Sequence, residues 1–203
     1  MPTSLARSLR ALPIIGLLWL ALLGQASAFR VVIDAGHGGH DRGAQSGYVY
    51  EKHLALDVAR RLEAYLKKRG ISSTLTRRSD TFVTLNGRVA VGNRYSDAVF
   101  VSIHFNSASN RGATGIETFY YTPQSELLAH LVHTNVIHKT RTVDRGVKHR
   151  GFRVIRASRN PSILVEGGFL SNGRECRTCI SRVHRQKLAE SIGHALVRYR
   201  KAR

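Results

Sequence analysis

Two histidines and two glutamates have the residue types that hydrolytic metal sites use. His37 lies in a glycine-rich segment, Glu51 stands at the start of an expected helix, and His104 and Glu166 each follow an apolar run. A catalytic zinc site needs about three protein ligands, an open position for water, and a separate base that takes a proton from that water. The four side chains would together be sufficient for metal-assisted hydrolysis if the fold brought them together.

Each of these residues taken alone has a simpler explanation. A carboxylate at Glu51 suits the dipole of a helix N-terminus without any metal. His104 could be a hydrogen-bonded histidine at a sheet edge, and Glu166 a solvated carboxylate at a strand end. They can form one site only if the helices and strands that carry them bring them together.

Apolar segments at residues 29–33, 98–103 and 162–165 are typical of buried strands. Strands alternate with helical segments along the chain, which predicts a single α/β domain with a twisted, mixed and largely parallel sheet flanked by helices. Ligands of such sheets collect at the carboxyl ends of the strands. His37, His104 and Glu166 follow three such ends, so we expect them to meet at one rim.

The remaining elements follow from apolar spacing and from helix-ending residues. Leu54, Val58 and Leu62 recur at helical spacing and predict a helix over residues 51–69, with Gly70 as its C-terminal cap. Four glycines between residues 36 and 43 mark a tightly turning loop. Further strands are expected at residues 71–76, 115–121 and 152–155, and further helices at residues 84–93, 125–140 and 183–198.

Four motifs occur in order along the chain: IDAGHGG at residues 33–39, YEK at 50–52, VSIHFN at 101–106 and LVEGGFLSN at 164–172. With them the chain resembles the zinc-dependent N-acetylmuramoyl-L-alanine amidases of type 3, the family of bacterial cell-wall autolysins and cell-separation amidases. Weaker matches lie at residues 77–80, at Leu85 with Arg88, and at residues 115–118 and 145–148. The resemblance covers residues 30–199, nearly all of the chain after its first 28 residues.

The resemblance implies a role for each of the four residues. His37, Glu51 and His104 would bind one Zn²⁺ ion, and Glu166 would act first as general base and then as the acid that protonates the leaving amine. The substrate would be peptidoglycan, and the bond cleaved would be the amide between N-acetylmuramic acid and L-alanine of the stem peptide.

Some members of this family carry a long helical insertion that blocks the site until an activator binds. His104 and Glu166 are only 62 positions apart here, and the segment between them holds one helix of ordinary length. We therefore expect an open site that is active without a partner.

The first 28 residues have the features of a secretory signal peptide. Arg7 and Arg10 precede an apolar run over residues 12–23, and the small residues at 26–28 fit cleavage before Phe29. The alternative is an uncleaved membrane anchor, but the run is interrupted by proline and glycine and is short for a span. We expect an exported protein of the periplasm or cell wall, with residues 29–203 forming the catalytic domain and no transmembrane segment after cleavage.

The net charge of the chain is +19, and removal of residues 1–28 would leave +17. Such a charge favours acidic partners and gives no information about fold. For an exported protein, anionic wall polymers or a membrane surface fit better than nucleic acid. General solubility without a specific partner is the alternative explanation. We expect a monomer.

Two cysteines and several other histidines could also bind a metal ion. Cys176 and Cys179 lie in a segment that departs from the family pattern, and we expect a local disulfide or two inert thiols without a catalytic role. Three histidines share one expected helix, and we interpret them as solvated polar positions on a basic surface: His130, His133 and His138. His40 and His53 flank the candidate ligands, but the spacing of His53 turns it away from Glu51.

Three other functions fit the sequence less well than that of an amidase. A catalytically silent peptidoglycan-binding or regulatory protein on the same fold should have lost a ligand or the base, yet all four residues are present. A nucleic-acid-binding protein is disfavoured by the export signal and by the lack of interleaved basic and aromatic residues. A zinc peptidase of the H-E-x-x-H type is disfavoured because that motif is absent.

Overall fold

Six strands form one mixed sheet in the computed structural model, which describes residues 29–203. The sheet order is β4 (Ser72–Leu75), β1 (Arg30–Ala35), β5 (Ala98–Asn106), β8 (Ser162–Phe169), β6 (Ile116–Tyr120) and β7 (Asp144–His149). All neighbouring strands pair in parallel except β6 and β8, which are antiparallel. The predicted α/β fold with a largely parallel sheet is thus confirmed, whereas the predicted signal peptide lies outside the described residues.

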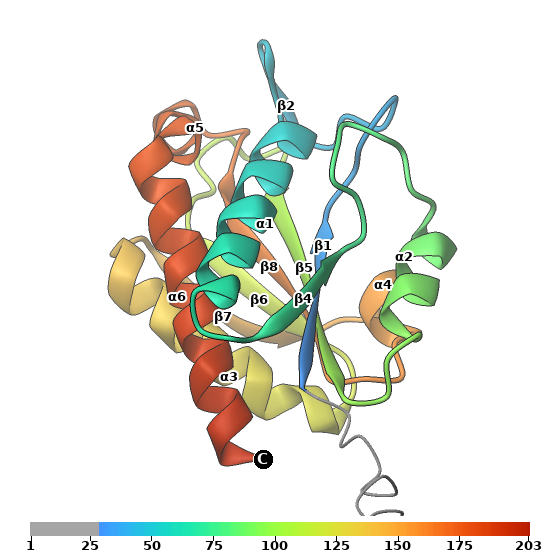
Figure 1. Ribbon diagram of the computed structural model, residues 1–203. Helices are drawn as coiled ribbons and strands as arrows, with labels where there is room; N and C mark the ends of the chain where they lie inside the picture. Colours follow the sequence, from blue (N-terminus) through green and yellow to red (C-terminus); the bar gives the residue numbers. More distant parts are fainter. Residues whose placement is uncertain (1–28) are drawn as a thin grey trace, which may run out of the picture.

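The helices are distributed unequally over the two faces of the sheet (Figure 1). Three long helices cover one face: α1 (Glu51–Lys67), α3 (Pro123–Thr140) and α6 (Arg182–Ala202). The other face carries only α2 (Leu85–Gly92) and the single turn α4 (Arg153–Arg156), while α5 (Gly173–Ile180) follows β8 and the hairpin of β2 (Gln45–Ser46) and β3 (Val49–Tyr50) precedes α1. No helix within residues 29–203 has both the length and the apolarity required to span a bilayer.

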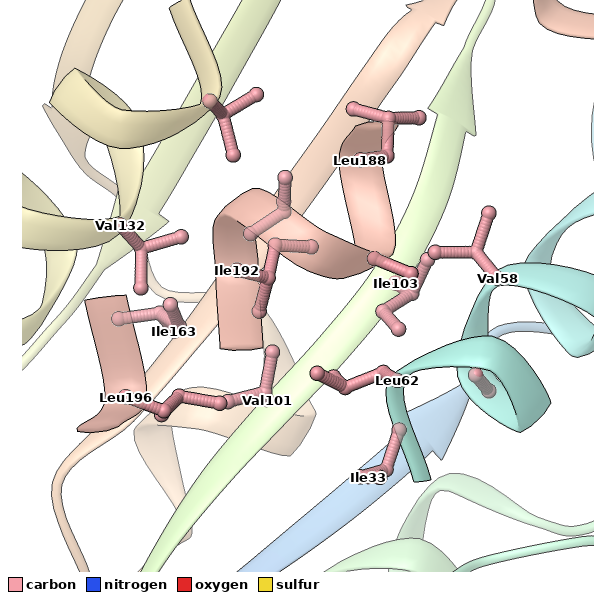
Figure 2. Packing of buried hydrophobic residues seen from close by; sticks show 14 of the residues in the cluster. Ile33, Val58, Leu62, Val101, Ile103, Val132, Ile163, Leu188, Ile192 and Leu196 are labelled. Carbon is pink, nitrogen blue, oxygen red and sulfur yellow. The ribbon is translucent and has the colours of Figure 1, made fainter. Parts of the chain in front are cut away.

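Alternation along the strands divides the core into two clusters. Figure 2 shows Val101 and Ile103 of β5 packed among Leu62 of α1 and Ile192 of α6, in the larger cluster. Phe100 of β5 and Leu164 of β8 belong to the smaller cluster, on the face that carries α2 and α4. Because side chains alternate between faces with a period of two, His104 and Glu166 project from the second, thinly covered face.

The strand ends differ from the sequence predictions in one respect that affects the site. The expected strands ended at residues 103 and 165, but β5 continues to Asn106 and β8 to Phe169. His104 and Glu166 therefore lie inside paired strands rather than in the loops that follow them. Backbone pairing restrains both side chains more than a loop would.

One predicted element is wrong, and three were not predicted. Residues 152–155 were expected to form a strand, but residues 153–156 form the helical turn α4, with Val154 and Ile155 buried in the smaller cluster. A short apolar run has no periodicity that separates a strand from a helical turn. Strand β7, helix α5 and the β2–β3 hairpin were missed because their sequences are polar or very short.

Helix α1 agrees with its prediction closely. It begins at Glu51 and ends at Lys67, and the chain then reverses at Gly70, whose φ of +65° suits a residue without a Cβ. Cys176 and Cys179 lie on α5 as buried free thiols. Of the two predicted states, the structure therefore has the free thiols and not the local disulfide. Burial raises the pKa of the Cys179 thiol, as expected of an unreactive cysteine.

Candidate metal and catalytic site

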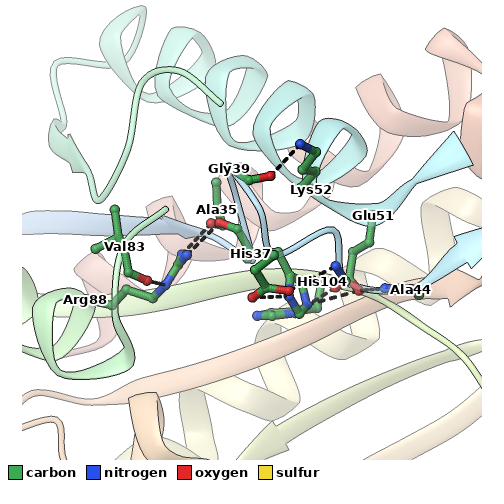
Figure 3. A network of polar contacts seen from close by, with 12 residues as sticks. Ala35, His37, Gly39, Ala44, Glu51, Lys52, Val83, Arg88 and His104 are labelled. Atoms are coloured by element: carbon green, nitrogen blue, oxygen red, sulfur yellow. Dashed lines mark hydrogen bonds and ion pairs between the residues drawn. The ribbon is translucent and has the colours of Figure 1, made fainter. Parts of the chain in front are cut away.

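The side chains of His37, Glu51 and His104 converge at the carboxyl end of β1 and β5 (Figure 3). Glu51 lies between the two imidazoles, with Oε2 3.1 Å from His37 Nε2 and Oε1 2.7 Å from His104 Nδ1. One nitrogen or oxygen atom from each residue lies within 4.8 Å of the other two. Within residues 29–203, this is the group of side chains whose spacing suits a single metal ion.

Two glycines leave room for this convergence. A Cβ atom on Gly36 would lie 2.4 Å from Cε1 of His104, and one on Gly43 would lie 2.5 Å from both Glu51 Oε2 and His37 Cδ2. These distances are far below van der Waals contact. The glycine-rich segment is therefore required by the packing of the three candidate ligands against the backbone.

Asp41 fixes the orientation of the His37 ring. Its Oδ2 atom is 2.8 Å from His37 Nδ1, and its Oδ1 accepts a hydrogen bond from the backbone N–H of Gly43. With Nδ1 engaged in this way, Nε2 is the ring nitrogen that faces Glu51. Asp41 was not predicted as a site residue, because its only signal in the sequence is a position four residues after His37, among other polar residues of the same loop.

A buried polar network supports the loop that carries His37. Arg88 of α2 and Asp34 of β1 form an ion pair of 2.7 Å in which both side chains are nearly inaccessible. Arg88 also donates to the backbone carbonyls of Ala35 and His37 (Figure 3). Arg77 donates to the carbonyls of Ala35 and Gly36, so two guanidinium groups clamp the backbone that carries His37.

The contacts within the cluster shift the pKa values of Glu51 and His37 in opposite directions. Burial alone would raise the pKa of Glu51, but hydrogen bonds and charge from His104 and His37 outweigh it and hold the pKa well below its usual range. Burial would lower the pKa of His37, yet Glu51 and Asp41 raise it. The two imidazoles that Glu51 contacts thus stabilise its ionised form.

Glu166 lies beside this cluster and has the opposite electrostatic environment. It stands directly opposite His104 in the β5–β8 pairing and opposite Glu117 in the β6–β8 pairing. Its Oε2 atom is buried without a hydrogen-bond partner in the described part of the chain. Burial, followed by the charges of Glu51 and Glu117, raises the pKa of Glu166 well above its ordinary value.

Glu117 in turn is held by two cations. Its Oε1 atom accepts hydrogen bonds from Arg145 at 2.5 Å and from Lys148 at 2.8 Å. Burial opposes ionisation, but these two partners lower the pKa of Glu117 overall. The weak sequence matches at residues 115–118 and 145–148 therefore meet beside Glu166.

The chemistry of this donor set fits zinc. Two imidazole nitrogens and one carboxylate oxygen are the ligand types of catalytic zinc sites, and three ligands leave a position open. The unpartnered Oε2 of Glu166 is the kind of buried polar atom that a structure retains for a functional purpose. The site residues therefore match the metal that the sequence resemblance implied.

The other histidines do not join the cluster. His40 packs against Phe82 with ring centroids 4.2 Å apart, and His53 lies 3.4 Å from Asp80. His133 was expected to be solvated, and this is wrong, because it is buried between Thr118 and Asp144. Its two ring nitrogens tie α3 to β6 and β7, which is a structural role.

The fold and the clustered side chains define an α/β domain with a candidate metal-hydrolase site at the carboxyl end of its sheet. A model of the N-acetylmuramoyl-L-alanine amidase family matches residues 31–198, and the chain belongs to this family. The resemblance identified from the four motifs is thereby confirmed.

Individual relatives agree with this membership. The uncharacterized protein YqiI of Bacillus subtilis (strain 168) is 36% identical over 173 residues, which are 83% of this chain and 84% of YqiI. The N-acetylmuramoyl-L-alanine amidase LytC of the same organism is 35% identical over 173 residues, and the match spans 35% of LytC. The chain thus corresponds to about a third of LytC.

Solved structures share the fold. The N-acetylmuramoyl-L-alanine amidase from Clostridium difficile 630 has a TM-score of 0.84 and 36% identity, and the match covers 88% of this chain and 100% of that one. The catalytic domain of CwlV, an N-acetylmuramoyl-L-alanine amidase from Bacillus (Paenibacillus) polymyxa var. colistinus, has a TM-score of 0.82 and 35% identity, with coverage of 87% and 99%.

Proposed function

We propose that the protein is a zinc-dependent peptidoglycan amidase that hydrolyses the bond between N-acetylmuramic acid and L-alanine of the stem peptide. The observation that carries the proposal is the juxtaposition of a His–Glu–His cluster with a partly buried glutamate on the neighbouring strand. Membership of the amidase family supports the same reaction. Cell-wall remodelling or cell separation is the proposed setting.

His37, Glu51 and His104 would hold one Zn²⁺ ion, and Asp41 would keep His37 in the tautomer that presents Nε2. When bound, zinc polarises the scissile carbonyl and lowers the pKa of water toward about 7. Glu166 removes a proton from the attacking water as the C–O bond forms. It then gives this proton to the nitrogen of L-alanine as the C–N bond breaks.

The environment of Glu166 suits both halves of this proton transfer. A base buried beside other carboxylates holds a proton more tightly than a solvated glutamate does, so it accepts one readily. A raised pKa moves a glutamate from its ordinary acidic range in the direction of neutral pH, where one group can act as base and acid in turn.

A defined soluble muropeptide tests the proposal. The purified protein should bind one zinc ion, release the peptide, and lose both properties on treatment with a chelator. Activity should return with added zinc. Full activity after the metal has been removed, verified by metal analysis, would contradict the zinc-dependent mechanism, and binding of muropeptide without any cleavage would favour the silent-binder alternative.

The site needs no activator in this proposal. Helix α3, the longest element between His104 and Glu166 in sequence, packs its buried residues Leu128, Val132 and Val136 into the core on the far face of the sheet. His37 keeps 24% of its side chain exposed, so the described part of the chain leaves the candidate ligands accessible. Protein purified alone should therefore be active, and a strict requirement for a second protein would contradict the proposal.

Export to the periplasm or cell wall, through cleavage after residue 28, belongs to the same proposal. The positive charge of the mature chain would attract anionic wall polymers. Binding of this kind weakens steeply as the ionic strength rises. Sedimentation with isolated walls at increasing salt tests it, since retention that does not change with salt would contradict an electrostatic attachment.

A further inference from the structure

A cavity of about 460 Å³ lies where helices α5 and α6 meet, and none of the candidate metal ligands lines it. Both helices are drawn in red tones in Figure 1, and their junction follows β8, at the end of the sheet that holds the candidate metal site. Arg174 and Arg177 of α5 and Lys187 of α6 line the cavity. Among its described lining residues there is no aspartate or glutamate, so its walls do not balance this positive charge.

The three cations of this cavity are exposed and lack anionic partners. None of them forms an ion pair or a side-chain hydrogen bond within residues 29–203. Glu175 lies on the same helix, but it is buried, and its oxygens accept hydrogen bonds from the backbone N–H groups of Gly115 and Phe169. Because neighbouring cations repel one another, an anion bound among them would be attracted by all three.

Uncharged donors add to the three cations. Ser181 precedes the first turn of α6, yet its side chain forms no capping hydrogen bond, and that turn contains no acidic residue. The first N–H groups of a helix have no partner in the helix and bear partial positive charge. The hydroxyl of Thr178, also in the lining, has no partner in the described chain. Arg185 donates to the carbonyls of Cys179 and Ile180, so the end of α5 does not oppose an anion.

His184 reports the same unbalanced charge from inside the lining. It is only 6% exposed; its Nε2 lies 3.2 Å from the carbonyl oxygen of Gly167, and its Nδ1 has no hydrogen-bond partner in the part of the chain that the structure describes. Burial, followed by the charges of Lys187 and Arg185, lowers the pKa of His184 although Gly167 opposes this shift. An anion in the cavity would offset these charges and raise the pKa again.

The positive surface continues beyond the cavity. Lys139 and Arg141 flank the lining residue Thr140, and Arg182 directly precedes the lining residue Val183. These three flanking cations are exposed, and they too lack ion-pair partners among residues 29–203. Cations spread over the ends of α3, α5 and α6 suit a ligand that bears anions at intervals better than they suit one small ion.

The mixture of donors favours phosphate as the anion. Phosphate oxygens accept hydrogen bonds from arginine, lysine, hydroxyl and helix N-terminal N–H groups, and all four kinds of donor meet at this junction. A linear chain can enter a cavity of this kind, whereas the surface of a bilayer can only cover it. The geometry therefore favours a polymer over a membrane.

We propose that the cavity at the α5–α6 junction binds the phosphate groups of a linear phosphodiester polymer of the cell wall. Arg174, Arg177 and Lys187 are the residues that contact the phosphates. The inference deepens the proposed attraction to anionic wall polymers and rests on the proposed export, but it does not depend on the amidase reaction. A polymer held there would keep the carboxyl end of the sheet close to the wall.

An oligomer of poly(glycerol phosphate) is the probe, and calorimetry at several salt concentrations measures its binding to the protein. The triple variant R174Q/R177Q/K187Q should bind at least about tenfold more weakly than the wild type, because it loses several charge-assisted hydrogen bonds. The slope of log affinity against log salt concentration should fall by about two, since each contact to a single-stranded phosphodiester contributes about 0.7.

The matched control is the triple variant K68Q/R156Q/R159Q, which removes the same charge from three exposed side chains that do not line the cavity. It should keep the wild-type affinity within about twofold, because screening weakens the attraction between distant charges. Equal losses of affinity in the two triple variants would overturn the site in favour of a general attraction by net charge.

Two further probes locate the ligand and identify its source. Inorganic phosphate should raise the pKa of His184, followed by NMR of its imidazole, and polymer binding without any change at His184 would overturn the site. Vesicles of phosphatidylglycerol should bind more weakly than the polymer. Tighter binding to the vesicles, lost in R174Q/R177Q/K187Q, would replace the polymer by a membrane.

Cleavage of a soluble muropeptide separates this inference from the proposed reaction. R174Q/R177Q/K187Q should cleave it at the wild-type rate, because none of the three cations belongs to the candidate metal and catalytic site. A wild-type protein that binds the polymer but cleaves no muropeptide would contradict the proposed function and leave the phosphate site standing. Cleavage without any polymer binding would do the reverse.

Discussion

His104 of β5 and Glu166 of β8 are directly opposed in the parallel pairing of the two central strands. A candidate metal ligand and the candidate base are therefore cross-strand neighbours on one face of the sheet, separated by backbone hydrogen bonds rather than by a flexible loop. Directly opposed residues on adjacent strands have Cβ atoms about 5 Å apart. The pairing of the two strands therefore fixes the distance between the candidate ligand His104 and the candidate base Glu166.

Replacing Glu166 by glutamine should stabilise the metal-free protein while abolishing catalysis. The pKa of Glu166 is raised in the folded state above its usual value of 4.5, so the unfolded chain ionises first. Folding stability is therefore lost as the pH rises through and above 4.5, and the neutral amide avoids this loss. We expect E166Q to gain on the order of 1 kcal/mol at about pH 7 and less at about pH 4.

Urea unfolding of metal-free wild type and E166Q at both pH values measures this gain. E190Q is a suitable control, because Glu190 is an exposed glutamate on α6. A gain for E166Q that is the same at both pH values, or a loss at neutral pH, would show that Glu166 is not held as a neutral acid.

Removal of the Asp41 carboxylate should weaken metal binding more than it weakens the fold. D41A frees His37 Nδ1, so the ring can rotate or adopt the other tautomer. Loss of such an orienting group typically lowers metal affinity about 10–100-fold. Competition with a zinc-binding dye measures the affinity directly, and D41N, which can still accept the hydrogen bond, should lose less than D41A.

D97A provides the comparison for this experiment, since Asp97 pairs with Arg203 at the opposite end of the sheet. Its zinc affinity should equal that of the wild type. Equal affinities for D41A and wild type would exclude Asp41 as the group that orients His37.

A methyl group at Gly36 should displace His104. The added Cβ would lie 2.4 Å from the imidazole, so G36A must move either the ring or the backbone. We expect a loss of about 1–3 kcal/mol in stability and a marked fall in zinc affinity. G173A should be neutral or slightly stabilising, because its Cβ would meet no atom within 4 Å. Zinc affinity in G36A equal to that of the wild type would contradict the proposed role of His104.

Loss of Arg88 should destabilise the protein far more than loss of an exposed arginine. R88A leaves the buried Asp34 carboxylate unpaired and frees the carbonyls of the His37 loop, at an expected cost of about 3–5 kcal/mol. R78A removes the arginine that pairs with Glu63, and the side chain of Arg78 is itself 66% exposed. This substitution should lower the free energy of unfolding by about 0–1 kcal/mol. Chemical denaturation measures both values, and similar costs would mean that the buried pair does not stabilise the loop.

The sequence predicted the fold class and the meeting of His37, Glu51 and His104 because these depend on strong signals. Long apolar runs identify the central strands, and helical spacing places the start of α1 at Glu51. The lengths of β5 and β8 were underestimated because the polar residues His104 and Glu166 interrupt the apolar runs although the pairing continues. Where a strand ends depends on the strand that it pairs with, so the sequence of one segment alone does not give its length.

The residues that surround the candidate ligands could not be predicted in the same way. Asp41 is one of several polar residues in its loop, and only the folded backbone shows that it contacts His37. The wall of the cavity beside His37 and His104 combines α4 with the segment before α2, and the turn at residues 153–156 was assigned to the wrong element. The pairing of Arg153 with Asn86 depends on that turn and has no signal in the sequence.

Digestion of purified peptidoglycan, with the products identified by mass, tests the central claim most directly. The zinc-loaded protein should release free stem peptides that begin with L-alanine, and chelator or the E166A substitution should abolish their release. The same peptides from E166A at an undiminished rate, or products cleaved at any other bond, would contradict the assignment of Glu166 as the group that moves the proton in amide hydrolysis.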